Sequence, residues 1–407
     1  MKNLFSLLCL FSSLSLFAQE DILIKAEEVT SHLNGANLEI YAGATQVYNA
    51  KQRIKFARNS LLPKLNIWRL STVLVDWRGA GEVLSQDLVP FLVPANWQRV
   101  KESKLLSEAT MEGFHGLKKN TIFQSKLMYF QLQQEIYQSN LHKEYLATLN
   151  KILASLSGQT HFNHQINQWY LDLSYKKALI EFDILEMDKL ILEERQQLSL
   201  ALGLNSQFII KPESLSLDSD LGLQNQNDFF HKEEDVLLHS CELKEFDFIL
   251  QVAPKIKNEI TWNILGISDI SRGAGGGIFD EIPIQDGLGF ATKSSLKIHK
   301  KQLELLQKQK EGVAQVLLRQ IQSITYRIKL LEQQKKVSLD KLKILQLAKE
   351  QMQLRLTLGE NFNPMHLSEL EQKLVLAKNS TISISFAIRS EYEKLKRLFE
   401  KDEYDIH

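Results

Sequence analysis

The sequence predicts a mainly α-helical protein with a small β part, built from two similar halves. Three observations lead to this prediction. Only 18 Gly and 7 Pro occur in 407 residues, which favours long uninterrupted helices. Apolar residues recur at intervals of three and four over two very long tracts. Two shorter regions change to an alternation of period two, which is typical of strands.

The first 18 residues have the features of a secretory signal peptide. Lys2 precedes an apolar stretch over residues 4–17, and Ala18 provides a small residue at the cleavage point. An uncleaved anchor is the alternative, but the stretch is shorter than the ~20 residues that a spanning helix needs. Because Cys9 lies in the signal, Cys241 is the only cysteine of the mature chain, and no intrachain disulfide is expected.

The charge balance excludes one class of partner. The chain has 49 basic and 49 acidic residues, and 44% of its residues are hydrophobic. A net charge of zero gives no broad attraction to phosphates, so nucleic acid is not an expected partner. The apolar content is too high for a disordered chain.

Two long helices are expected, over about 97–157 and 290–357. Neither tract contains proline, and apolar residues recur in both at helical spacing with Lys, Gln and Glu between them. At ~1.5 Å per residue, a helix of some 65 residues is ~100 Å long. Coiled coils and helical barrels use helices of that length, whereas a globular domain does not.

Shorter helical tracts flank the long ones. The pattern dissolves between residues 204 and 227, where Gly203, Asn205 and Pro212 accompany Ser and Asp, and we interpret this segment as a connector. The shorter helices are expected over about 20–59, 165–203, 228–250 and 365–401.

Four short strands are expected, two in each half. Trp68 and Leu70 share one face of the first strand, while Ile260, Trp262 and Ile264 share one face of the third. The second strand is interrupted by Pro90, which donates no ladder hydrogen bond. We place the four strands at about 65–77, 82–93, 256–270 and 277–288.

The two halves share landmarks in the same order. Leu-Pro-Lys-Leu at 62–65 matches Ala-Pro-Lys-Ile at 253–256, and the segment 158–163 matches 359–363 through Gly, Phe and Asn. The offsets are 191 and about 200 positions. Two copies are too few for an open solenoid. We therefore expect two structural repeats, the first over 19–227 including the connector 204–227, and the second over 228–407.

The strands suggest an oligomer. An isolated two-stranded hairpin rarely persists in water, and four short strands do not close a barrel. Three chains would supply twelve strands, enough for a closed barrel without a free edge. One-sided apolar strands suit a wall in which lipid-facing and lumen-facing side chains alternate. We expect a trimeric 12-stranded β-barrel in the outer membrane, with the long coiled-coil helices forming an α-barrel.

Three features of the sequence resemble the TolC family of outer-membrane efflux proteins. They are the order of the elements, the Leu-Pro-Lys-Leu motif at 62–65, and the Arg-Leu-Thr-Leu-Gly motif at 355–359 followed by Leu367. The resemblance covers nearly the whole mature chain. It implies a homotrimer in the cell outer membrane that extends into the periplasm. It further implies a channel of a tripartite efflux or type I secretion system, with a periplasmic adaptor protein and an inner-membrane transporter as partners. Such a channel would pass drugs, metals or proteins outward by passive conduction.

The resemblance also implies where the periplasmic tip lies. In the family the glycine-bearing turns form the tip, so Gly158 and Gly359 would mark it here. The family's best-known gate is a network of aspartate, tyrosine and arginine, which this sequence replaces with Asn361, Met365, His366 and Ser368. The candidate adaptor-contact residues are Leu156, Ser157, Gly158, Arg355, Leu356, Leu358 and Gly359.

Tryptophans provide a second candidate site. Trp68 and Trp262 lie in matching strands of the two halves, and we expect them at the membrane interface, where tryptophan is enriched. Ordinary core packing is the alternative. Trp97 and Trp169 lie in helical tracts and are expected to be packing residues.

Other motifs have simpler interpretations. A phosphate loop at 273–277 would need a following helix, so a loop between strands is favoured. His161 and His164 have a spacing seen in metal sites, but a solvated turn is favoured because no third ligand is near in sequence. Asp280 and Glu281 fit a solvated strand end better than a carboxylate ring at a pore or a catalytic pair. We therefore expect no enzyme, no cofactor and no metal.

Two rival functions are weighed against the channel. A periplasmic coiled-coil structural or adaptor protein without a pore is the first, but a pump adaptor would need many more strands and would not repeat its layout. An exported enzyme is the second, and no grouping of Ser, His, Asp or Cys supports it.

Overall fold

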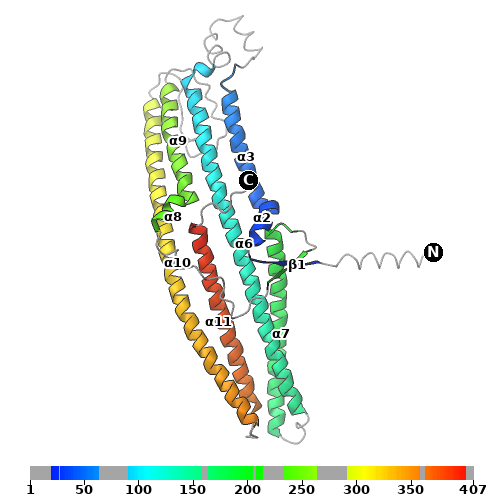
Figure 1. The fold of residues 1–407 in the computed structure, drawn as a ribbon. Helices are drawn as coiled ribbons and strands as arrows, with labels where there is room; N and C mark the ends of the chain where they lie inside the picture. The colour runs from blue at the N-terminus through cyan, green and yellow to red at the C-terminus, as the bar shows by residue number, and fades with distance from the viewer. Residues whose placement is uncertain are drawn as a thin grey trace, which may run out of the picture. The chain divides into compact units, whose positions relative to one another are not determined.

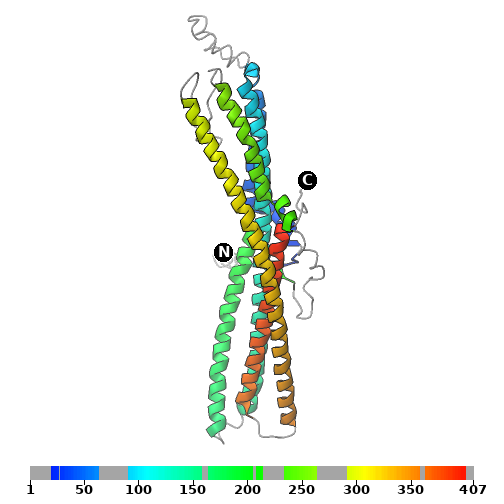
Figure 2. The same cartoon turned by 90° about the vertical axis from the view of Figure 1, so that its left-hand side faces the viewer.

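The computed structural model describes residues 20–26, 28–63, 90–157, 164–204, 208–213, 233–263, 291–357 and 363–399. They form long helices and one pair of short strands (Figure 1 and Figure 2). The predicted class, mainly α with a small β part, is confirmed. The elements are β1 (Glu20–Ile24), α2 (Glu28–Ala36), α3 (Leu38–Asn59), the 3₁₀ helix η4 (Pro90–Leu92), α6 (Pro94–Ser157), α7 (His164–Ala201), β2 (Phe208–Pro212), α8 (Glu233–His239), α9 (Cys241–Asn263), α10 (Ala291–Thr357) and α11 (Pro364–Phe399).

The chain divides into two compact units. Unit 1 comprises Met1–Leu38, Thr121–Phe230 and Gln322–Arg397, and unit 2 comprises Glu39–Asn120, His231–Ile321 and Leu398–His407. Each long helix, α6 and α10, contributes its first part to unit 2 and its second part to unit 1. The sequential repeats 19–227 and 228–407 stay a prediction.

The long helices lie where the sequence places them. α6 has 64 residues and α10 has 67, against the expected tracts 97–157 and 290–357. α6 begins with Pro94 and α11 with Pro364. Proline suits a first helical position, because the N–H that it lacks would have no partner there.

α7 and α11 agree within a few residues with the tracts expected at 165–203 and 365–401. The other two tracts differ more, because α2 begins only at Glu28 and α9 extends to Asn263.

α7 has a defined end. Gly203 follows α7 with φ of 67°, a left-handed conformation that glycine adopts readily. The N–H of Leu204 donates to the Ser199 carbonyl at 2.9 Å, and the Asn37 amide donates to the Ala201 carbonyl at 2.7 Å. These bonds satisfy carbonyls that the helix leaves without partners.

The strand predicted at 256–270 is wrong over its described part. α9 continues as a helix through Asn263, with Pro254 inside it. Ile256 and Ile260 are buried together with Val252, which is helical spacing. Glu259, which would lie on the face of such a strand opposite Ile260 and Trp262, is 2% exposed. Positions four apart fall on one face of both a strand and a helix, so the short alternation misled the prediction.

The strand predicted at 82–93 is also wrong where it is described, because Pro90–Leu92 forms a 3₁₀ turn that leads into α6. Pro90 presets the backbone angle for such a turn. Several other predictions lie outside the described residues. They are the rest of the strand at 82–93, residues 264–270 of the third strand, the strands at 65–77 and 277–288, and the signal peptide at 1–18.

The strands of the described part lie elsewhere. β1 pairs in parallel with β2, with Glu20 opposite Phe208 and Ile24 opposite Pro212. The sequence predicted a helix for the first segment and an irregular connector for the second. Both predictions are wrong, because five residues are too few to show a period and the pairing joins distant segments. The Tyr129 hydroxyl of α6 donates to the Ile24 carbonyl at 2.8 Å and thereby fixes the pair to unit 1.

Unit 1 combines a buried apolar core with ion pairs at its edges. Tyr129 and Phe130 of α6 are fully buried, and the Arg389 guanidinium of α11 lies 4.1 Å from the centre of the Phe130 ring. Such a cation–π contact stabilises the pair further. Lys126 of α6 bonds Glu393 of α11 at 3.3 Å. These contacts join α6 to α11.

Unit 2 packs the ends of four helices together. Val252, Ala253, Ile256, Ile260 and Leu306 form a buried cluster that joins α9 to α10. A second cluster of Ala57, Leu61 and Val100 joins α3 to α6.

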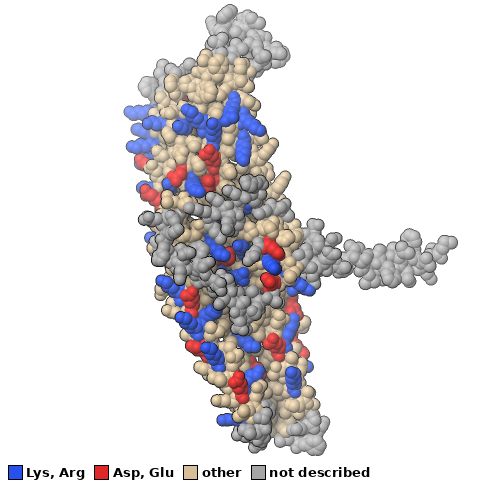
Figure 3. Space-filling view, viewed as in Figure 1, with Lys and Arg blue, Asp and Glu red and all other residues tan. Residues whose placement is uncertain are grey.

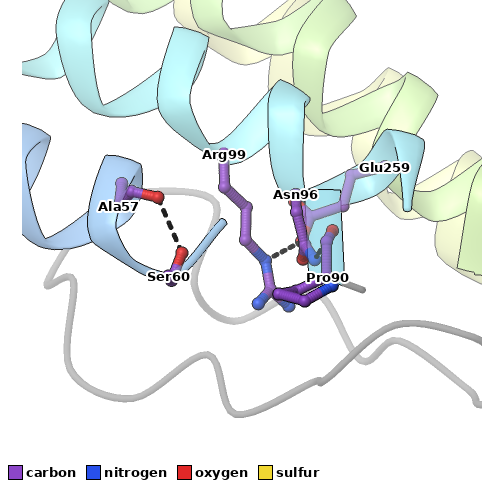
Figure 4. A network of polar contacts seen from close by, with 6 residues as sticks. All are labelled: Ala57, Ser60, Pro90, Asn96, Arg99 and Glu259. Carbon is purple, nitrogen blue, oxygen red and sulfur yellow. Dashed lines mark hydrogen bonds and ion pairs between the residues drawn. The ribbon is translucent and has the colours of Figure 1, made fainter. Parts of the chain in front are cut away.

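Polar contacts complete this end of unit 2 (Figure 4). Arg99 Nε donates to Glu259 Oε1 at 2.9 Å, which links α6 to α9 through a buried carboxylate. The Asn96 amide donates to the Pro90 carbonyl at 2.8 Å. The turn at Pro90–Leu92 is therefore fixed to the first turn of α6.

Candidate functional site

Two helical hairpins of unit 1 turn at the same end of that unit. α6 ends at Ser157 and α7 begins at His164, while α10 ends at Thr357 and α11 begins at Pro364. Both views place these four helix ends together (Figure 1 and Figure 2). We call this end the hairpin tip. The helix ends on either side of the two glycine-bearing segments thus belong to one region of unit 1.

An apolar cluster underlies the hairpin tip and ties the hairpins to each other. Its buried members come from α6 and α7, and residues of α11 pack against them. Such a core holds the helix ends at fixed positions. The buried residues are Tyr145, Leu149, Ile152, Leu153, Leu156 and Leu173, and the residues packed on them are Ile166, Tyr170, Ile180, Met365, Leu367 and Val375.

Buried polar groups position the start of α11. The Tyr145 hydroxyl lies 3.2 Å from the carbonyl and 3.2 Å from the Oγ of Ser368. Burial raises the pKa of the Tyr145 phenol, so it stays a neutral hydrogen-bonding group. Asn363 caps α11, because its Oδ1 accepts the Met365 N–H at 2.9 Å.

The structure divides the candidate contact residues into two kinds. Leu156 is only 8% exposed and belongs to the apolar cluster. Ser157 and Arg355 are exposed at the ends of α6 and α10. The Ser157 hydroxyl donates to the Ala154 carbonyl at 2.9 Å.

The remaining candidates are placed less fully. Leu356 lies in the last turn of α10, and Gly158, Leu358 and Gly359 lie outside the described residues. Among the candidate residues that the structure describes at the tip, Ser157 and Arg355 are the exposed polar ones.

The residues that replace the expected gate network are structural in part. Ser368 is fully buried and contacts Tyr145, and Met365 packs on the apolar cluster. His366 is exposed, with its Nδ1 4.0 Å from Glu369 Oε2. Two of the four positions thus serve packing at the base of α11.

Unit 1 presents two apolar stripes on its surface. On α10, Leu330, Val337 and Ile344 are exposed at intervals of seven, the repeat of a coiled-coil seam. On α7, exposed apolar residues recur at threes and fours, which makes one face of that helix apolar. The α7 stripe consists of Leu171, Tyr175, Leu179, Phe182 and Leu185. Extended exposed apolar surface of this kind marks an interaction site.

A pair of carboxyl groups lies between α6 and α7 in unit 1. Gln131 Nε2 donates to Glu194 Oε1 at 2.5 Å, and the Oε2 atoms of Glu135 and Glu194 are both buried. Burial, and then the hydrogen bond and charge of Glu135, raise the pKa of Glu194 to about 8. The Glu194 carboxyl therefore stays protonated at neutral pH. The sequence showed no sign of this pair, because its members are 59 positions apart.

Trp97 and Trp262 lie at one end of unit 2. Trp262 lies in the last turn of α9 and is 43% exposed. Trp97, which the sequence predicts to be a packing residue, is also exposed, and its Nε1 donates to the Phe91 carbonyl at 2.8 Å. That prediction is wrong. Trp68 lies outside the described residues.

Within the described ranges, no three His, Cys, Asp or Glu residues are grouped so that they could hold a metal ion. The loop 273–277 and the pair Asp280–Glu281 lie outside those ranges.

Of the helices that the structure describes, none is long and apolar enough to cross a membrane.

No protein-family model matches the sequence. No curated protein matches it either.

The fold is similar to that of several solved outer-membrane channels. The open-state MtrE channel of Neisseria gonorrhoeae is 12% identical, and the match covers 92% of this chain and 88% of that chain with a TM-score of 0.69. VceC of Vibrio cholerae is 11% identical, with 92% and 97% covered and a TM-score of 0.67. CmeC of Campylobacter jejuni is 11% identical, with 92% and 85% covered and a TM-score of 0.65. The resemblance to TolC-family channels is confirmed at the level of the fold.

Proposed function

We propose that the chain is the outer-membrane channel of a tripartite efflux or type I secretion system, through which drugs, metals or proteins leave the cell by passive conduction. The observation that carries the proposal is the fold match, which extends over nearly the whole chain and nearly the whole of several outer-membrane channels. A fold supports many functions, but here the match extends over 92% of this chain and 97% of VceC. The chain has no catalytic role in this proposal.

The working unit of the proposal is a homotrimer. The stripes on α7 and α10 support it, since each stripe would be covered when neighbouring chains pack side by side into an α-barrel. Three chains would also complete a 12-stranded β-barrel.

Location and partners follow from the same proposal. A signal peptide at 1–18 would export the chain, the barrel would lie in outer-membrane lipid, and the helices would extend into the periplasm. The hairpin tip would contact a periplasmic adaptor, which in turn binds an inner-membrane transporter. Ser157 and Arg355 would make the first contacts, with Gly158, Leu356, Leu358 and Gly359 beside them, while Leu156 supports the tip from within.

The proposal is tested by conductance. Purified protein added to a planar lipid bilayer should give discrete current steps, and outer-membrane fractions should contain a heat-modifiable trimer. A soluble periplasmic monomer would contradict the proposal and favour a coiled-coil structural or adaptor protein without a pore. Crosslinking in cells followed by pull-down would then identify the adaptor and transporter, and through them the cargo.

A further inference from the structure

The end of unit 2 that holds the four helix termini is strongly basic. Lys and Arg are concentrated in the last turns of α3 and α9 and in the first turns of α6 and α10. We call these residues the basic band. Its members are Lys51, Arg53, Lys55, Arg58, Arg99, Lys101, Lys104, Lys255, Lys257, Lys293, Lys297, Lys300 and Lys301.

Basic residues exceed acidic ones far more in these segments than in the rest of the chain. The stretches 51–62, 90–104, 255–263 and 292–301 contain these 13 basic residues and only two acidic ones. Because the whole chain has 49 of each sign, the remainder has 36 basic and 47 acidic residues. Charge is thus separated along a molecule whose net charge is zero.

Acidic residues offset only part of the band. Glu304, just beyond the last stretch, pairs with Lys301 at 2.7 Å. Glu259 is buried and already bonded to Arg99 at 2.9 Å. Glu102 is half-buried on α6. Most lysines of the band, in contrast, are exposed. Figure 3 shows Lys and Arg gathered over this end of unit 2, with few acidic groups among them.

Part of the band lies where positive charge does not stabilise the helix that carries it. α10 has no acidic residue in its first turn but has Lys293 close to its N-terminus, where a positive charge opposes the helix dipole. Lys293 and Lys297 are four apart, as are Lys297 and Lys301, and like charges at that spacing repel. These lysines therefore do not stabilise α10 by themselves.

Exposed apolar residues lie beside the band. We call them the apolar rim, which consists of Leu62, Phe91, Leu92, Trp97 and Trp262. On α6 and α9 the rim residues are nearer the helix end than the basic residues are. Tryptophan next to lysine and arginine is the composition of a protein surface at the boundary of a lipid bilayer.

We propose that the basic band binds the anionic headgroups of phospholipids on the periplasmic side of the outer membrane, while the apolar rim enters the headgroup layer. This inference rests on the proposed function, since it requires unit 2 to end at that membrane. The band then acts as an electrostatic collar that sets how deep the channel lies. Association with a negatively charged leaflet grows with each exposed Lys or Arg.

The test measures lipid selectivity. The full-length protein is reconstituted in phosphatidylcholine vesicles with a trace of spin-labelled phosphatidylglycerol or phosphatidylcholine, and the immobilised fraction of each is compared. We expect the anionic lipid to associate roughly threefold or more strongly at 0.1 M salt, a preference that disappears at about 1 M salt because the charges are screened.

A matched pair of variants locates the effect. The variant K51Q/K55Q/K293Q/K297Q removes four exposed lysines of the band, and its selectivity should fall close to one. The control K329Q/K336Q/K341Q/K343Q removes four exposed lysines of α10 within unit 1 and should keep the wild-type preference. Both variants should keep the wild-type conductance.

The two proposals fail in different ways. Protein that inserts and conducts but shows equal affinity for both lipids, or loses selectivity equally in both variants, overturns the lipid inference and leaves the channel standing. Protein that neither inserts nor conducts overturns both.

Discussion

Glu135 and Glu194 place two acidic groups between α6 and α7, where water does not fully reach them. With the pKa of Glu194 raised to about 8 from its ordinary 4.5, the folded chain holds a proton that the unfolded chain releases at lower pH. The free energy of unfolding therefore falls as pH rises between those two values. Above about pH 8 the Glu194 carboxyl loses this proton and leaves a charge in a half-buried site.

Replacing Glu194 with Gln should remove this dependence. The amide keeps the shape and the hydrogen bond to Gln131 but has no charge, so the variant should melt at a higher temperature than wild type above pH 8 and at a similar one near pH 5. Thermal melting followed by circular dichroism from pH 5 to 9 measures the difference. Glu193→Gln on the neighbouring exposed position is the control and should retain the wild-type pH profile.

The apolar cluster under the hairpin tip depends on Leu149, which is fully buried. Leu149→Ala should lower the free energy of unfolding by about 2–5 kcal/mol, because it removes buried contacts and leaves a cavity. Chemical denaturation measures the loss. Asn150→Ala alters the adjacent exposed position and should change stability by less than about 0.5 kcal/mol. Equal effects of the two substitutions would show that the cluster does not stabilise this end.

The candidate site was only partly visible in the sequence. The glycines at 158 and 359 indicated turns, and the structure places both turns at one end of unit 1. The role of Leu156 as a core residue, and of Ser368 as a partner of Tyr145, depends on contacts between helices far apart in sequence. No local pattern marks such contacts, since the same apolar spacing serves both a core and a surface stripe.

Single elements differ in how tightly they approach their neighbours. Gly43 of α3 faces α6 so closely that a Cβ would lie 2.7 Å from Phe114 and 2.8 Å from Leu117. Gly312 of α10 has nothing within 4 Å of such a Cβ. Both glycines sit inside helices, where glycine is unfavourable relative to alanine, and only Gly43 has a packing reason to be there.

Alanine substitutions should therefore act in opposite directions. Gly43→Ala should destabilise unit 2 by about 1–3 kcal/mol, because overpacking outweighs the gain in helix propensity. Gly312→Ala should stabilise the protein by about 0.5–1 kcal/mol. Denaturation midpoints of the two variants give the comparison. A stabilising Gly43→Ala would mean that Phe114 and Leu117 move aside without cost.

Helix length decided which elements the sequence predicts well. α6 and α10 repeat the helical period many times, so the pattern is unambiguous. The segment 256–263 offers one repeat, and its buried residues Ile256 and Ile260 are four apart, a spacing that both a strand and a helix allow. β1 and β2 were missed for a different reason. Two parallel strands are not joined by a tight turn, so the sequence contains no hairpin signal between them.

At the scale of the whole molecule, the apolar stripes on α7 and α10 are exposed to water in a single chain. In the proposed trimer each stripe meets a neighbouring chain. A charge placed on a stripe would then be buried without a partner, at a cost of several kcal/mol per interface.

The double variant V337E/I344E should thus abolish the trimer and its conductance while the helical content by circular dichroism is kept. Native mass spectrometry and unheated gel electrophoresis measure the oligomer. Lys336→Glu also reverses charge on the exposed surface of α10, next to the stripe, and should leave the trimer intact. A trimer that survives V337E/I344E would show that the α10 stripe lies outside the interface.

The pairing of β1 with β2 has a consequence for the order of folding. Glu20 pairs with Phe208, which lies 188 residues further along the chain. The strand β1 therefore stays unpaired until the segments of α2, α3, α6 and α7 have been added. Closing so long a loop costs entropy before any contact repays it, which slows the step. During that interval the Ile22–Ile24 edge stays open to wrong partners. Folding of this chain is therefore favoured by any factor that keeps β1 unpaired until the segment of β2 is available.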